Sequence, residues 1–249
     1  MKTSTIFTCA ATLLVCLSGS AKAQLISDRT TLDDILGSQA ITDTFAGVPV
    51  LPGAQLRIYS AVDSTTVAPI NCRTSPCTSG GGSTVGPGVV TPGVTFDRPG
   101  GLVTTYPIDF NGTGYFGIPV NTISRIYGPA IQDIDFTTPV KAVGFDLWSY
   151  RGFGSAGTIS VYDTHGNLLD TTNIADFHSP TAAESVFFGW QSSAGIGEIV
   201  ISTPNHSNYL SLATVEYGFA PGPNVGEGLL SFAAMSALLI LAKYRGLFV

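Results

Sequence analysis

Hydrophobic and polar residues alternate in short runs along most of this 249-residue chain, a pattern typical of β-strands with one buried face. In the run 142–148, Val143, Phe145 and Leu147 fall on one face of the strand, and the residues between them fall on the other. Residues that favour turns, chiefly Gly, Pro and Asn, separate these runs. The predicted strands are 55–62, 102–106, 114–118, 131–136, 141–148, 157–162, 168–172, 185–190, 198–202 and 214–218.

One short helix is expected before the strands begin, over residues 27–37. Thr30 or Thr31 can cap its N-terminus, and Gly37 can end it. Between two predicted strands, the sequence Asp-Thr-His-Gly-Asn at 163–167 predicts a hairpin turn. Because no helix separates the strands, the fold class expected is all-β, an antiparallel β-sandwich.

The first 23 residues have the pattern of a secretory signal peptide. Lys2 precedes an apolar stretch at 6–17, and Ala21-Lys22-Ala23 provides a cleavage site with small residues at its outer positions. The apolar stretch is shorter than the roughly 20 residues that span a bilayer, although a retained anchor is the alternative. We therefore expect export machinery and signal peptidase as partners, with Gln24 as the mature N-terminus.

The last part of the chain, residues 221–249, reads as a membrane anchor. Pro221, Gly222 and Pro223 interrupt the preceding structure, and the basic residues Lys243 and Arg245 follow an apolar segment at 229–242. A buried core helix is the alternative, but the terminal position and the basic end favour a membrane helix. Its large aliphatic residues include Leu229, Leu230, Leu238, Leu239, Ile240 and Leu241.

This three-part tail resembles the sorting signal of bacterial PEP-CTERM proteins, with Gly222 in place of the usual Glu. The resemblance implies export, membrane insertion and an exosortase as a partner. The segments FTTPVKAVGFDLW, GTISVYDTHGNLL, SVFFGW and GIGEIVIS, within 130–218, are similar to the jelly-roll-like ectodomains common in that class. The resemblance thus implies a jelly-roll-like ectodomain at 24–220, located at the cell envelope or released to the extracellular matrix.

Composition and charge narrow the possible functions. Hydrophobic residues make up 44% of the chain and charged residues only 11%, which excludes an intrinsically disordered protein. The net charge of −6 argues against a nucleic-acid partner, because nucleic-acid binding needs a basic surface. Residues 24–220 alone carry 16 acids and 7 bases, and their length suits one sandwich domain.

Two cysteines remain after removal of the signal peptide, Cys72 and Cys77. An even number in an exported chain, with four residues between them, favours a local disulfide over free thiols or a metal site. The segment 77–94 that follows is rich in Gly, Ser, Thr and Pro and predicts a flexible connector, either a long surface loop or a boundary between subdomains.

Carboxylates are the only abundant ionisable groups. Asp133 and Asp135 stand two apart on a predicted strand, where paired acids could hydrolyse glycosides or bind Ca²⁺. A solvent-exposed strand face explains them more simply. The run that begins at Asp109 starts like a calcium loop but has Val120 where the final Glu belongs. No catalytic motif is present, so we expect no enzyme and no cofactor, with Ca²⁺ as the one open possibility.

Aromatic residues cluster at the end of the strand 141–148. Trp148, Tyr150 and Phe153 could form a platform for a sugar, although core packing explains Trp148 equally well.

The favoured function is a non-catalytic exported β-sandwich, anchored at the surface or destined for the matrix. The alternative is a carbohydrate-binding module that takes extracellular polysaccharide as its partner.

Overall fold

The computed structural model describes most of the predicted ectodomain. The predicted strand 102–106, Phe153 and the sorting tail 221–249 lie outside the described residues. Within the part that is described, no helix is long and apolar enough to cross a membrane. The described residues are 22–72, 76–78, 84–97, 107–124, 131–150, 156–175, 177, 181–203 and 210–219.

Short strands dominate the described chain, together with one α-helix and two 3₁₀ turns named η1 and η3. In chain order they are β1 Gln24–Ile26, α1 Arg29–Leu36, η1 Gly37–Gln39, β2 Ile41–Asp43, β3 Gln55–Ile58, β4 Ala68–Pro69, β5 Asn71–Cys72, β6 Thr84–Val85, β7 Val94–Asp97, β8 Ile108–Asn111, η3 Tyr115–Gly117, β9 Thr122–Ser124, β10 Ile131–Ser149, β11 Gly157–Tyr162, β12 Leu168–Ile174, β13 Glu184–Ser202 and β14 Leu210–Phe219.

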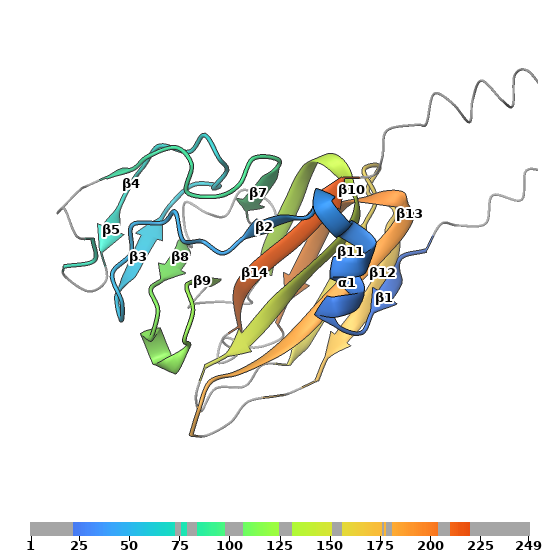
Figure 1. Ribbon diagram of the computed structural model, residues 1–249. Coiled ribbons are helices and arrows are strands. Elements are labelled where there is room, and N and C mark those ends of the chain that lie inside the picture. The colour runs from blue at the N-terminus through green and yellow to red at the C-terminus, as the bar shows by residue number, and fades with distance from the viewer. Residues whose placement is uncertain are drawn as a thin grey trace, which may run out of the picture.

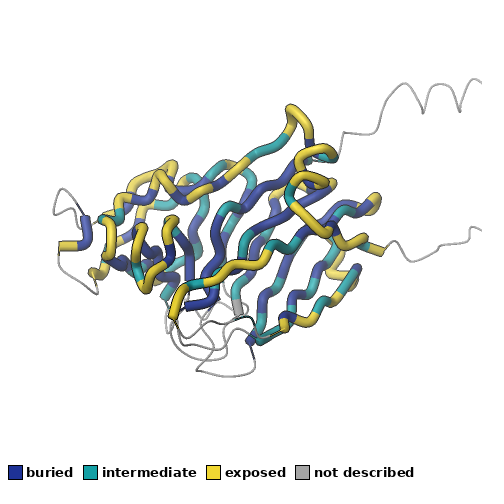
Figure 2. The backbone as a smooth tube through the Cα atoms, turned by 60° about the horizontal axis from the view of Figure 1, so that its bottom comes forward, coloured by how far each residue is buried: buried dark blue, intermediate teal, exposed yellow. Residues whose placement is uncertain are grey.

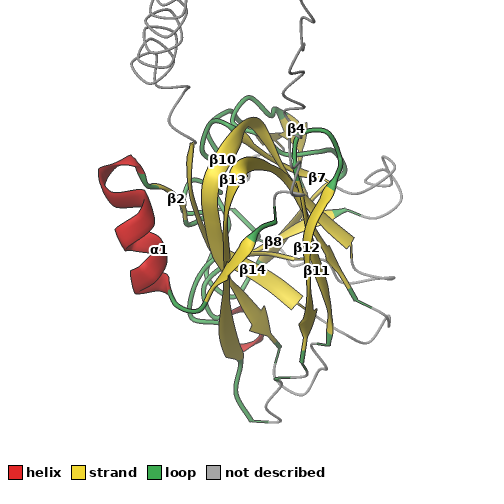
Figure 3. Ribbon diagram, turned by 90° about the vertical axis from the view of Figure 1, so that its right-hand side faces the viewer, coloured by secondary structure: helices red, strands yellow, loops and turns green. Residues whose placement is uncertain are grey.

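Twelve of the strands form one antiparallel sheet, which folds over on itself into two layers (Figures 1 and 3). Its order is β12-β11-β13-β10-β14-β9-β8-β3-β5, with β1, β2 and β7 paired at the sides. We call the layer that carries α1 the helix layer and the layer that contains β11 and β12 the hairpin layer. The prediction of an all-β antiparallel sandwich with a short N-terminal helix is confirmed.

The two longest strands, β10 and β13, run through both layers and bend between them. The first part of β10 pairs with β7 and with the end of β13, whereas the part from Val140 onward pairs with β14 and the start of β13. The register shifts between Asp135 and Val140, where Pro139 lies. Opposite, Gly195 has a φ of +81°, and a Cβ there would lie 2.7 Å from the Cβ of Pro139. The bend therefore requires glycine at 195.

Side chains from both layers fill the space between them. Val143, Phe145 and Leu147 are buried there, as the alternation predicts, and the Trp190 indole packs 5.8 Å from the Phe145 ring. Figure 2 shows buried residues along the middle of the sandwich and exposed residues on its turns. The core is continuous through the bend, so the two layers form one hydrophobic unit.

The helix α1 lies on the outer face of the helix layer (Figure 3). Leu32 and Leu36 pack over Gly144 and Gly218, where a Cβ would lie 2.6 Å from each leucine methyl carbon. Asp28, rather than Thr30 or Thr31, caps its N-terminus, because the Asp28 carboxylate accepts a hydrogen bond from Thr31 N at 2.9 Å. Gly37 ends the helix with a φ of 54°, as the sequence predicts.

Some predicted elements differ from those observed. The predicted strands 131–136 and 141–148 join into β10, and 185–190 and 198–202 join into β13. The prediction of a strand at 114–118 is wrong, because Gly114, Phe116 and Gly117 all have positive φ, which an extended chain does not allow. The short strands β4 to β9 were not expected, since each is too short to show an alternating pattern.

The predicted disulfide between Cys72 and Cys77 is present, with the two Cα atoms 5.6 Å apart. The segment after it is partly a folded piece of the sandwich. Val85, Val89 and Val90 are buried in the core, and β6 pairs with β4. Within the segment 77–94, the stretch 84–94 therefore supplies apolar side chains to the core.

Candidate functional site

An open hollow of about 690 Å³ lies at the end of β10 on the outside of the helix layer. Trp148 from β10 forms one side of it, and the η3 turn forms another. Its size falls within the range of roughly 300–1,000 Å³ that is usual for small-molecule sites. The lining residues are Gly114, Phe116, Gly117, Pro119, Trp148, Thr181, Ala182 and Ala183.

Trp148 is placed by the alternation of β10. Its neighbour Leu147 points into the core, so the Trp148 side chain lies on the outer face and remains half-buried. The residues directly across from it on the two adjacent strands are Ser185 of β13 and Ser211 of β14. Because both are small, they leave room beside the indole ring. Of the three aromatic residues predicted for a platform, Trp148 is the one that the described structure places in the hollow.

Phe116 is the second aromatic residue of the hollow, and the pattern of hydrophobic and polar residues gives no sign of it. It is 45% exposed and has a φ of 50°, a conformation that is costly for a side chain of its size. Gly114 N donates a hydrogen bond to Ile118 O at 2.6 Å, which closes the turn around it. Asn121 Oδ1 accepts from both the backbone N and the Oγ1 of Thr113, at 3.0 and 3.1 Å. The turn is therefore held in a shape that presents Phe116 at the surface.

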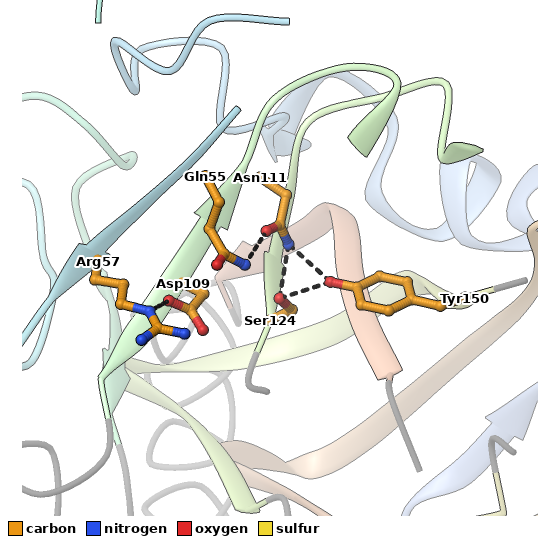
Figure 4. Close-up of polar contacts among 6 residues, drawn as sticks. All are labelled: Gln55, Arg57, Asp109, Asn111, Ser124 and Tyr150. Atoms are coloured by element: carbon orange, nitrogen blue, oxygen red, sulfur yellow. Dashed lines mark hydrogen bonds and ion pairs between the residues drawn. The ribbon is translucent and has the colours of Figure 1, made fainter. Parts of the chain in front are cut away.

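Tyr150 does not lie on the surface as the platform would require. It is fully buried beneath Phe116, with the two ring centres 4.8 Å apart. Its hydroxyl donates to Ser124 Oγ at 2.9 Å and accepts from Asn111 Nδ2 at 3.0 Å (Figure 4). Burial raises the pKa of the Tyr150 phenol, so the hydroxyl keeps its proton. Tyr150 thus supports the hollow from below, and Phe153 lies outside the described residues.

A row of buried polar side chains continues from Tyr150 across the helix layer (Figure 4). Asn111 Oδ1 accepts from Gln55 Nε2 at 2.7 Å, and Asn111 Nδ2 also donates to Ser124 Oγ at 2.6 Å. Next to them, Arg57 Nε donates to Asp109 Oδ1 at 2.8 Å, with the Asp109 side chain 1% exposed. Asp109 therefore belongs to a buried ion pair. This network connects β3, β8 and β9 to Tyr150, the residue on which the Phe116 ring packs.

None of the described residues that line the hollow has an ionisable side chain. Its side chains supply two aromatic rings, small aliphatic groups and one hydroxyl, from Thr181. Such a surface suits a neutral ligand with both apolar C–H faces and hydroxyl groups, since the rings pack against the former and the polar groups can bind the latter.

The paired acids Asp133 and Asp135 lie elsewhere, in the part of β10 that belongs to the hairpin layer. Asp133 is paired across the sheet with Asp97, and Asp135 with Glu198. The structure does not bring this acidic cluster to the aromatic hollow, because the bend of β10 separates them. Among the described residues, no three His, Cys, Asp or Glu side chains are grouped so that they could hold a metal ion.

Burial, together with the charges of Glu198 and Asp97, raises the pKa of Asp135 to about 6. The native state then binds more protons than the unfolded state between pH 4 and pH 6, so the contribution of Asp135 to stability is lost as the pH rises through about 6. We expect Asp135→Asn to raise the free energy of unfolding at pH 7.5 by about 1 kcal/mol, after allowance for solvent screening. The gain should vanish near pH 4.

Urea unfolding at pH 4.5 and 7.5 measures this difference. Asp163→Asn is the matched control, because hydrogen bonds from Asn167 and from the His165 backbone lower the pKa of Asp163. Its replacement should therefore destabilise the protein at pH 7.5, the opposite sign. If the Asp135→Asn variant is no more stable than the wild type at pH 7.5, the raised pKa of Asp135 is contradicted.

Comparison with known proteins does not place the chain in a family. No family model and no curated protein sequence matches it. Solved structures similar to parts of it have low scores and low identities. They include the family 29 carbohydrate-binding module CBM29_1 from Piromyces equi (TM-score 0.33, 10% identity, 53% of this chain and 83% of that one), the K2 cleaved adhesin domain of Lys-gingipain (0.33, 11%, 74% and 100%), and CsCBM6-3 from Clostridium stercorarium in complex with cellobiose (0.26, 19%, 40% and 75%).

Proposed function

We propose that this protein is a non-catalytic β-sandwich that binds a neutral carbohydrate in the hollow between Trp148 and Phe116. The observation that carries the proposal is the presence of these two rings in one hollow whose described lining residues are all uncharged. Nothing in the core requires either ring at that position, since Trp148 is on the outer face and Phe116 is 45% exposed.

The physical basis is the amphipathic character of a sugar ring. One face of a pyranose exposes C–H groups, which pack against an aromatic ring and release water from both surfaces. The rigid turn that holds Phe116 reduces the entropy lost on binding, because that ring does not have to be ordered by the ligand. The buried hydroxyl of Tyr150, fixed by Ser124 and Asn111, keeps the support beneath Phe116 in place.

A glycan array, probed with the purified protein after removal of residues 1–23, tests the proposal. Binding is expected to neutral glycans and is expected to persist with a chelator, since no described lining residue is charged and could hold Ca²⁺. Hits must be repeated in solution by calorimetry. Absence of binding to every neutral glycan, with and without Ca²⁺, contradicts the proposed function.

We also propose that the protein is exported and held at the cell envelope by a PEP-CTERM-like tail. The signal-like residues 1–23 and the apolar and basic segment at 221–249 support this. The Cys72–Cys77 disulfide supports it as well, because such bonds persist in oxidising compartments outside the cytoplasm.

Deletion of 221–249 is expected to move the protein from the membrane fraction to the medium, since it removes both the apolar segment and the cations that follow it. Immunoblots of fractionated bacteria measure the distribution. The matched control replaces Ser231 with Ala, which leaves the sorting motif, the apolar segment and the cations in place and should keep the protein in the envelope. A deleted form that stays with the membrane contradicts the anchor.

A further inference from the structure

A second hollow, of about 340 Å³, lies near the mature N-terminus and contains the two described lysines. The chain has four lysines, of which Lys2 and Lys243 lie outside the described residues. Both of the others contribute to this one hollow. Its lining residues are Lys22, Gln24, Lys141, Gln191, Ser192 and Ser193.

The other described cations are neutralised by carboxylates. Arg29 pairs with Asp146 at 3.0 Å and with Glu216 at 2.8 Å, and Arg57 pairs with Asp109. In contrast, neither Lys22 nor Lys141 has a salt bridge to any carboxylate in the described stretches. On a chain with a net charge of −6, this hollow therefore concentrates positive charge without an internal partner.

The remaining lining groups are neutral and rich in hydrogen-bond donors. Gln191 Nε2 donates to Gln24 Oε1 at 2.9 Å, which fixes both amides and uses the Gln24 oxygen as the acceptor. The Gln24 amide nitrogen therefore still carries donors, and the Gln191 oxygen is an acceptor. Lys141 Nζ also contacts the carbonyl of Ile35 at 3.5 Å, near the end of α1, which limits the range of its ammonium group.

The ammonium group of Lys141, with amides and hydroxyls beside it in one hollow, matches an anionic group attached to a hydroxylated body. We propose that this hollow binds the carboxylate of an acidic saccharide, a uronic acid unit, through Lys141. The lysine holds the carboxylate, while Gln24, Gln191 and Ser193 can bind the hydroxyl groups. A peptide carboxylate would use the ammonium group but would leave the amide and hydroxyl groups without sugar hydroxyls to bind.

Signal-peptide cleavage after Ala23 removes Lys22 from this hollow and leaves Lys141 in it. Lys141 then becomes the only lysine within residues 24–220. The proposal therefore depends on Lys141 in both forms of the chain.

The lysine hollow is separate from the aromatic hollow. Lys141 and Trp148 are seven residues apart on β10, or about 23 Å at roughly 3.3 Å per residue. The acidic ligand is therefore expected to bind normally to a Trp148→Ala variant, and failure of one site leaves the other testable.

Calorimetry with the protein that lacks residues 1–23 tests the proposal. Oligogalacturonate is the acidic probe, and its methyl ester is the neutral one. We expect oligogalacturonate to bind at least tenfold more tightly than the ester, and Lys141→Met to lose this difference. Lys141→Arg should retain it, because it keeps the charge. Equal binding of acid and ester, or no effect of Lys141→Met in a correctly folded variant, overturns the proposal.

A labelling experiment gives an independent readout without any variant. Acetic anhydride acetylates exposed lysines, and mass spectrometry of the peptides reports the extent at Lys141. Oligogalacturonate is expected to slow acetylation of Lys141 at least threefold, whereas the methyl ester and a peptide with a free C-terminal carboxylate should not. Protection by the peptide but not by oligogalacturonate overturns the saccharide assignment, and no protection by either overturns the site.

Discussion

Replacement of Trp148 by alanine is expected to weaken glycan binding by about 2–4 kcal/mol, a factor of roughly 30 or more. The indole ring forms one side of the aromatic hollow and has only serines beside it on the adjacent strands, so no neighbouring side chain can replace its surface. Stability should change much less, because the ring lies on the outer face and is half-buried.

Calorimetry with a neutral glycan identified on the array measures the loss. Tyr59→Ala is the matched control, because Tyr59 is an aromatic residue that is 42% exposed and does not line the hollow. Phe116→Gly tests the opposite side, and glycine also removes the cost of the positive φ at that position. Normal glycan binding by both Trp148→Ala and Phe116→Gly contradicts the assignment of this hollow as the binding site.

The second large effect concerns stability rather than binding. We expect Asp109→Ala to lower the free energy of unfolding by about 3–5 kcal/mol, because it leaves the mostly buried Arg57 guanidinium without its counter-charge. Asp109 is 1% exposed and lies on β8, next to Asn111 of the network that supports Tyr150. A loss of this size is a substantial part of the roughly 5–15 kcal/mol that stabilises a typical domain.

Chemical denaturation followed by tryptophan fluorescence measures this loss, with Asp34→Ala on the exposed face of α1 as the control. The double variant Arg57→Met, Asp109→Leu removes both charges and should recover much of the stability, because neither side chain is then left charged and unpaired. If Asp109→Ala is as stable as Asp34→Ala, the ion pair does not stabilise the sandwich.

Part of the candidate site follows directly from the sequence. Alternation along 142–148 places Leu147 in the core and Trp148 on the opposite face, and the structure agrees. The same alternation would place Tyr150 beside Trp148, but β10 ends at Ser149, and alternation of faces applies only within a strand. Tyr150 is buried with its hydroxyl bound to Ser124 and Asn111, which are 26 and 39 residues away in the chain.

The position of Phe116, in contrast, does not follow from the sequence. Its segment has the composition of a strand, and no local pattern indicates that its φ is positive or that its ring packs on Tyr150. The glycines at 114 and 117 permit a turn, but only the hydrogen bonds within 112–121 select it over an extended chain. Similarly, Lys22 and Lys141 are more than a hundred residues apart, and the pairing of β1 with β13 and of β13 with β10 brings them together.

The all-β class, the faces of the long strands, the disulfide and the position of the short N-terminal helix follow from the sequence, because each depends on residues that are close together in the chain. The bend of one sheet into two layers at Pro139 and Gly195, and the side chains that meet in each hollow, are known only from the folded chain. Both depend on packing and hydrogen bonds between segments that are distant in the sequence. These contacts form, and stabilise the structure, only when the sheet has brought the segments together.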